Sequence, residues 1–194
     1  MHKATRTAIL LALPALVLLG PNASASDVVV VGTDIRVHDA TPPEVAMVRW
    51  AVGRYGNAHL ELPSLDIYFH EDVSRCRGGI GFYAGDRIDM CPGLIMNLVP
   101  RHDMLHEMAH AWSNHSLTAD EREAFVSLRG IRTWNSQDEP WQVRGFEQTA
   151  EIVAWAIGDG VITPSIPNND EASLVADYEL LTGSPPSASV TSAS

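Results

Sequence analysis

The chain is expected to fold as an α+β domain, with a small antiparallel or mixed sheet packed on one central helix and on further helices. Two observations predict this class. Short segments with strand patterns, separated by turn residues, fill much of the first half of the chain, and apolar residues at helical spacing fill the second half. We find no internal repeat, and residues 26–183 have the length of a single domain.

The strand segments are short and bounded by glycine, proline or acidic residues. Residues 65–69 alternate apolar and polar side chains, as a half-buried strand does. The turn Ala84-Gly85-Asp86 separates two further segments and predicts a hairpin. The first two segments are expected as strands or as a lead-in arm. The expected strands lie at residues 28–31, 35–37, 65–69, 81–83 and 87–91.

The helical segments carry start and stop signals. Thr41 and Glu44 have the spacing of a capping box, and so do Thr118 and Glu121. Pro100 is a natural start for the helix that follows it. Glycines end several of the periodic segments. The expected helices lie at residues 42–56, 101–112, 119–129, 145–157 and 171–181.

The start of the chain has the composition of a signal peptide, residues 1–25. Lys3 and Arg6 precede an apolar run at 9–19, and residues 23–25 have the small side chains of a cleavage site. The apolar run is too short to span a bilayer. We therefore expect a secreted protein, in an extracellular or periplasmic-type compartment, without stable membrane insertion.

The rest of the chain is strongly acidic. It holds 11 basic and 24 acidic residues, a formal net charge of −13, and its basic residues are all arginine. A surface of this charge without a basic run argues against nucleic-acid binding and favours solubility. We expect a monomer. Residues 184–194, rich in Ser, Pro and Ala, are expected to be a disordered tail.

The chain has two cysteines, Cys76 and Cys91. In an exported protein an isolated pair is most simply a disulfide. Neither cysteine has the surroundings of a catalytic thiol, and a structural zinc site would need more ligands than this pair offers.

Residues 106–110 read His-Glu-Met-Ala-His. On a helix, His106 and His110 would point the same way, one turn apart, and two imidazoles suit Zn²⁺. Glu107 would lie beside a metal-bound water, where its carboxylate can take a proton. This pattern is the metalloprotease signature, although HExxH also occurs by chance in unrelated helices.

A third ligand is expected downstream. Glu147 and Glu151 lie one turn apart in a segment with helical apolar periodicity. The alternative is that both are solvated acids on the surface of that helix. The longer metzincin pattern fails, because Ser113 and Ser116 occupy its glycine and histidine positions and His115 is off by one.

With these motifs, residues 41–158 resemble the gluzincin class of zinc metallopeptidases. The resemblance implies a zincin-like fold in which the last strand before the zinc helix, residues 87–91, borders the cleft. It also implies that Glu147 is the third ligand and that Glu151 supports His106 from outside the ligand set. The class usually has Asp at the second position, and the longer Glu151 could instead bind the metal itself.

The expected function is hydrolysis of a peptide or protein substrate, with Zn²⁺ as cofactor and Glu107 as the general base. Tyr83, His115 and Arg144 are candidates for stabilising the transition state, and the sequence does not choose among them. Two alternatives remain open. One is a non-catalytic exported binding protein stabilised by zinc, and the other is a zinc amidase acting on cell-wall peptides.

Overall fold

The computed structural model describes residues 28–186, except residues 33, 93–97 and 159–161. The expected signal peptide and residues 187–194 of the expected tail lie outside the described residues. Within the described part, the chain is an α+β protein with one five-stranded sheet and five α-helices.

The sheet is mixed, with the strand order β1-β2-β3-β5-β4. The two outer pairs, β1 with β2 and β4 with β5, are antiparallel, whereas β2–β3 and β3–β5 are parallel. The first two strands are therefore part of the main sheet and not a lead-in arm. The strands are β1 (Val29–Val31), β2 (Ile35–His38), β3 (Leu65–Phe69), β4 (Gly81–Tyr83) and β5 (Arg87–Met90).

The expected hairpin forms, but its outer strand is not the one predicted to border a cleft. Strand β5 pairs with β3 on one side and β4 on the other, so its backbone is satisfied within the sheet. The edge strand is β4, because the turn at Gly85 folds it back outside β5. The resemblance implied that residues 87–91 border the cleft, whereas the strand at this edge of the sheet is β4.

The helices begin and end near their expected limits, with one extension. They are α1 (Pro42–Asn57), α2 (Leu98–Ser116), α3 (Ala119–Leu128), α4 (Gly145–Ile157) and α5 (Glu171–Thr182). Glu44 accepts a hydrogen bond from the backbone N–H of Thr41, as a capping box requires. Helix α2 is longer than predicted at both ends. Pro100 lies in its first turn, where proline removes no helical hydrogen bond.

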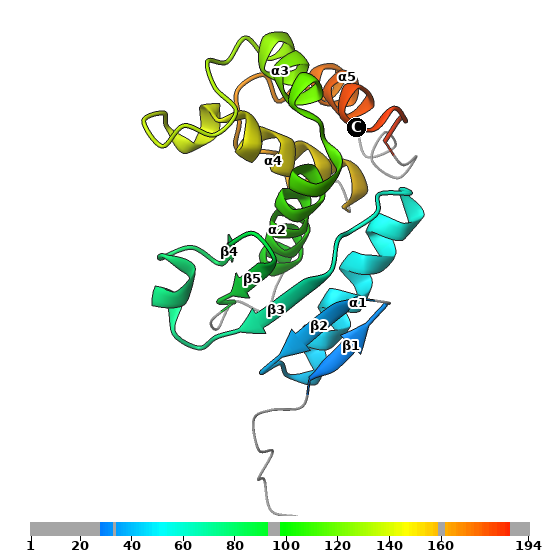
Figure 1. Cartoon of the computed structure of the whole chain (residues 1–194), viewed down its shortest axis with the longest axis vertical. Coiled ribbons are helices and arrows are strands. Elements are labelled where there is room, and N and C mark those ends of the chain that lie inside the picture. The colour runs from blue at the N-terminus through cyan, green and yellow to red at the C-terminus, as the bar shows by residue number, and fades with distance from the viewer. Residues whose placement is uncertain (1–27, 33, 93–97, 159–161, 187–194) are drawn as a thin grey trace, which may run out of the picture.

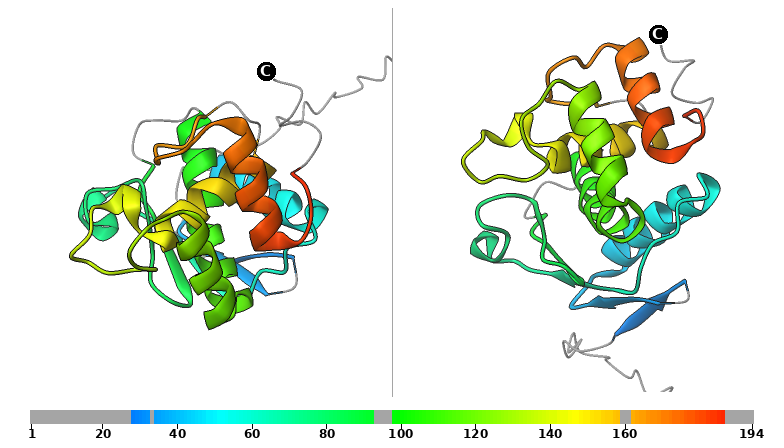
Figure 2. Two further views of the ribbon diagram at one scale, coloured as in Figure 1. Left: turned by 90° about the horizontal axis from the view of Figure 1, so that it is seen from above. Right: turned by 45° about the horizontal axis from the view of Figure 1, so that its top comes forward.

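Helix α2 runs through the centre of the molecule (Figure 1). The sheet and α1 lie on one side of it, and α3, α4 and α5 lie on the other, as both views in Figure 2 agree. Its closest packing is with α4. Two short 3₁₀ turns, η1 (Val73–Cys76) and η2 (Trp141–Val143), flank the strand β4 and the helix α4 respectively.

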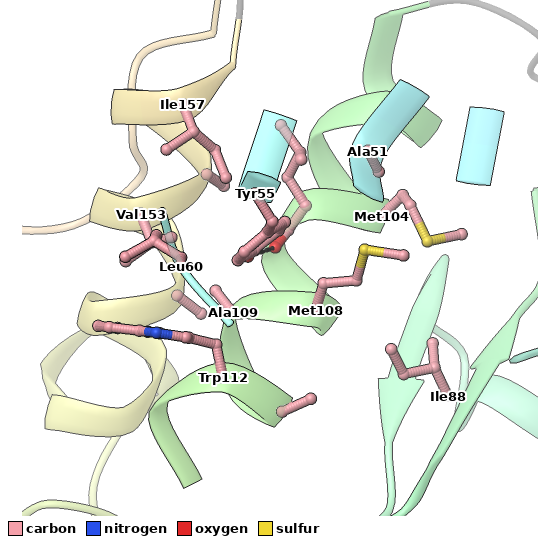
Figure 3. Packing of buried hydrophobic residues seen from close by; sticks show 14 of the residues in the cluster. Ala51, Tyr55, Leu60, Ile88, Met104, Met108, Ala109, Trp112, Val153 and Ile157 are labelled. Carbon is pink, nitrogen blue, oxygen red and sulfur yellow. Dashed lines mark hydrogen bonds between the residues drawn. The ribbon is translucent and has the colours of Figure 1, made fainter. Parts of the chain in front are cut away.

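The apolar side of α2 makes the core. Met104 and Met108 point toward the sheet strand that carries Ile88, and Trp112 lies beside Val153 of α4 (Figure 3). All of these side chains are buried. Burial of a side chain this large is worth roughly 1.5–3 kcal/mol. The core thus holds α2 firmly between the sheet and α4.

Cys76 and Cys91 are joined in a disulfide whose Cα atoms lie 6.1 Å apart. It connects η1 to the residue directly after β5 and so brackets the segment that contains β4. None of the helices in the described part of the chain is long and apolar enough to cross a membrane.

Candidate metal centre

Three histidines lie on one side of helix α2. His102, His106 and His110 follow one another at intervals of four residues, so their side chains stack one turn apart. His106 and His110 are buried, and their rings meet edge to face with centroids 4.6 Å apart. A buried helix face that carries imidazoles needs polar partners.

Helix α4 provides those partners. Glu147 and Glu151 lie one turn apart on α4 and face α2. One oxygen of Glu147, Oε2, lies 3.3 Å from His106 Nε2 and 3.2 Å from His110 Nε2. The alternative that these acids are solvated surface residues is wrong, because Glu151 is buried and the Glu147 side chain is only 13% exposed.

The spacing of these three atoms suits a tetrahedral metal ion. Two ligands held at about 2.0–2.1 Å in a tetrahedron lie about 3.3 Å apart. The two distances from Glu147 Oε2 to the imidazole nitrogens match this edge length. They are longer than the 2.7–2.9 Å typical of charge-assisted hydrogen bonds. His106, His110 and Glu147 therefore form a donor set, two nitrogens and one oxygen, that fits Zn²⁺.

Glu151 lies on the other side of His106. Its Oε1 is 3.0 Å from His106 Nδ1, and its Oε2 accepts a hydrogen bond of 3.2 Å from the backbone N–H of Ser165. A carboxylate at Nδ1 keeps that nitrogen protonated and leaves the Nε2 lone pair free for a metal. His110 Nδ1, by contrast, has no hydrogen-bond partner among the described residues.

Glu107 projects from α2 toward the edge strand β4. Its side chain is buried, and a Cβ atom built on Gly81 would lie only 2.7 Å from its Oε1. Burial raises the pKa of Glu107 to about 7, although the charge of His106 and a hydrogen bond from the Tyr83 backbone oppose the shift. A carboxyl group with a pKa near neutrality is suited to accept and return a proton.

The pKa values of the two imidazoles are shifted in opposite directions. Burial lowers the pKa of His110 to about 4. Burial also disfavours the charge of His106, but hydrogen bonds to Glu147 and Glu151 outweigh it and raise the pKa of His106 to about 10. Burial disfavours the charge of Glu147 as well, but hydrogen bonds with His106 and His110 outweigh it and lower the pKa of Glu147 to about 2. The Glu147 carboxylate is therefore ionised at neutral pH.

Aromatic rings wall the candidate metal centre. Phe146 stacks on His110 with ring centroids 4.0 Å apart, and Trp141 stacks on His106 at 6.0 Å. Tyr83 lies 6.1 Å from His110 and 6.4 Å from Phe146. These rings pack against the two imidazoles and cover part of the site.

The three candidates for transition-state stabilisation differ in position. Tyr83 lies at the site, and its hydroxyl accepts a hydrogen bond of 3.3 Å from Asn114. Arg144 precedes α4, but its guanidinium donates to the carbonyl of Glu139 and to Gln137 in the preceding loop. His115 is a helical residue, not a loop residue. It lines a pocket with residues 59–63 that includes none of the candidate ligands.

Comparisons with protein-family models, with curated proteins and with solved structures found no match to this chain.

Sequence reasoning missed His102, Gly81 and the aromatic wall. The four-residue interval between His102 and His106 was a usable signal, because it equals the interval within the HExxH motif. Gly81 and Glu107 lie 26 positions apart in the sequence, and no local sequence pattern predicts their contact. Phe146 precedes Glu147 directly, but its stacking on His110 depends on how α4 packs on α2.

Proposed function

We propose that this chain is an exported zinc-dependent peptidase with a zincin-like fold of the gluzincin type. The observation that carries the proposal is the spacing of Glu147 Oε2 from the Nε2 atoms of His106 and His110, 3.2–3.3 Å, in a donor set whose two histidines are buried. This set leaves a fourth tetrahedral position for water. When bound there, Zn²⁺ would lower the pKa of a water to about 7 and polarise a carbonyl group.

In this proposal Glu107 is the general base. It follows His106 directly and is buried against β4, so its carboxylate lies beside the metal ligands without belonging to them. It would take a proton from the attacking water and pass it to the leaving amine. Tyr83 is the remaining candidate for stabilising the oxyanion, since its ring lies beside His110.

The edge strand β4 suits an extended substrate. Among the described strands it pairs with β5 alone, so the part of its other side that Glu107 does not bind could accept the backbone of a peptide. Gly81 and Tyr83 of this strand both adjoin the proposed catalytic residues. A peptide bound there would run past Glu107. Export through a signal peptide would provide the oxidising compartment in which a disulfide persists.

The test is metal-dependent cleavage by the purified protein without residues 1–25. We expect about one Zn²⁺ per chain and hydrolysis of an unstructured protein such as casein. A chelator should abolish hydrolysis, and Zn²⁺ should restore it. The matched variant is Glu107→Gln, which keeps the shape of the side chain and removes the base. It should bind Zn²⁺ normally and lose at least about 100-fold in kcat.

Three outcomes would contradict parts of this proposal. Zinc binding without cleavage of any peptide substrate would favour the non-catalytic binding protein. Cleavage of cell-wall peptides but not of casein would favour the amidase. Full activity of the Glu107→Gln variant would remove Glu107 as the base.

A further inference from the structure

His102 lies in the candidate metal centre but has no part in the proposed hydrolysis. It precedes His106 by one turn of α2, and its side chain is 12% exposed. Its Nε2 lies 3.2 Å from Oε1 of Glu151, the same oxygen that is 3.0 Å from His106 Nδ1. Two imidazoles thus share one carboxylate oxygen, and the backbone N–H of Ser165 binds the other oxygen.

We propose that His102 is a positioning residue that fixes the Glu151 carboxylate, and through it the imidazole of His106. The inference rests on the metal site proposed above. A glutamate has one more rotatable bond than an aspartate, so its carboxylate needs more contacts to stay in one orientation. In the structure these contacts are His102 on α2 and Ser165 after α4.

The orientation of the Glu151 carboxylate matters because its Oε1 is the hydrogen-bond partner of His106 Nδ1. The carboxylate accepts a hydrogen bond from Nδ1–H of His106, which directs Nε2 toward Glu147 and the proposed metal position. Without His102, the long side chain is free to turn away from Nδ1 or toward the metal. Either movement would weaken the hold on His106.

A different role for His102 would be that of a second metal ligand. His102 Nε2, His106 Nδ1 and Glu151 Oε1 lie close enough together to hold an ion. Filling that site together with the one proposed above would use both nitrogens of His106 and would require its imidazole to lose both protons. We therefore expect one metal per chain.

The test compares His102→Leu, which removes the donor, with His102→Gln, whose amide N–H₂ can reach a position near Nε2. His115→Leu is the matched control, because it changes an exposed histidine on the same helix. Zinc affinity is measured by competition with a chelator, and Co²⁺-loaded protein gives the ligand-field spectrum. Thermal unfolding of the metal-free variants checks that each one folds.

We expect His102→Leu to weaken zinc binding by 10- to 100-fold and to change the Co²⁺ spectrum. His102→Gln should recover most of the affinity, and His115→Leu should match the wild type. In a chain that already carries Glu151→Ala, the His102→Leu change should have no further effect, because its partner is gone.

Each remaining outcome overturns a separate statement. Unchanged affinity and spectrum in His102→Leu overturn the positioning role alone. An equal loss with and without Glu151 means that His102 does not act through this carboxylate. If the wild type binds two metal ions per chain and His102→Leu binds one, His102 is a metal ligand. A wild type that binds no Zn²⁺ overturns the metal site and this inference with it.

Discussion

At the scale of single residues, the position of the proposed base Glu107 depends on a glycine, Gly81, which has no Cβ atom. A Cβ atom on Gly81 would lie 2.5 Å from Cγ of Glu107, closer than real carbon atoms approach. The backbone torsions of Gly81 are ordinary for a strand, so glycine is needed here for space and not for a left-handed conformation. Strand β4 and the Glu107 carboxylate can therefore lie in contact.

Gly81→Ala should displace the Glu107 carboxylate and leave the zinc ligands in position. We expect kcat to fall roughly 100-fold, as a misplacement of about 1 Å can cause, while zinc affinity stays within about threefold. The control is Gly53→Ala in α1, where a new Cβ meets no atom within 4 Å. Steady-state kinetics and zinc titration of both variants check this. Equal activity in the two variants would contradict the role of Gly81.

The protonation of His106 predicts that zinc binding releases a proton. Its pKa of about 10 means that metal-free His106 is charged at pH 6, whereas His110, with a pKa of about 4, is already neutral. A metal ligand must give up its proton. Calorimetric titrations of Glu107→Gln at pH 6, in two buffers of different ionisation enthalpy, should give about one proton released. The Gln variant removes the titration of Glu107 itself. A value near zero would mean that His106 is neutral before it binds metal.

At the scale of elements, the site is the contact between two helices. Helix α2 presents the imidazoles and α4 presents the carboxylates, and both sets repeat every four residues. Glu147 meets the two Nε2 atoms, and Glu151 meets Nδ1 of His106. The helix–helix packing therefore determines which acid adjoins the metal position and which acid lies behind it.

The two acids should respond differently to removal. Glu147→Ala deletes a proposed ligand and should weaken zinc binding by more than about 1000-fold, whereas Glu151→Ala should weaken it only about 10- to 100-fold. Competition with a chelator measures both variants under one condition. The assignment is inverted if the Glu151 variant loses zinc outright while the Glu147 variant binds normally. If neither variant changes the affinity, the two-helix metal site is wrong.

Much of this arrangement could be predicted from local patterns, because helices repeat at short range. The four-residue intervals predicted that His106 and His110 share a face, and that Glu147 and Glu151 share another. The pairing of β3 with β5 is non-local and parallel, and no hairpin signal reveals it. For that reason the sequence did not reveal that β5 lies inside the sheet and β4 at its edge.

At the scale of the whole molecule, α2 couples the core to the site. Its apolar side chains pack against the sheet and α4, and its histidines face the carboxylates of α4. The disulfide between Cys76 and Cys91 ties together the two ends of the segment that forms β4. Core packing and this covalent link thus hold the edge strand against Glu107.

The disulfide should contribute to stability. Its two cysteines are 15 positions apart, and a loop of this size adds about 3 kcal/mol in the chain-entropy model. Replacing both cysteines with alanine should lower the free energy of unfolding by about that amount, measured by urea denaturation. Mass spectrometry after alkylation of the unreduced protein provides the check on the bond. Two alkylated thiols would contradict it.

The position of the bound metal is the most direct test of the central claim. Crystals of the zinc-loaded protein, measured on both sides of the zinc absorption edge, locate the ion by its anomalous signal. We predict one peak per chain, about 2.0–2.2 Å from Nε2 of His106, Nε2 of His110 and a carboxylate oxygen of Glu147. A peak bonded to His102 and Glu151 instead, or zinc-soaked crystals with no peak at these residues, would contradict the account.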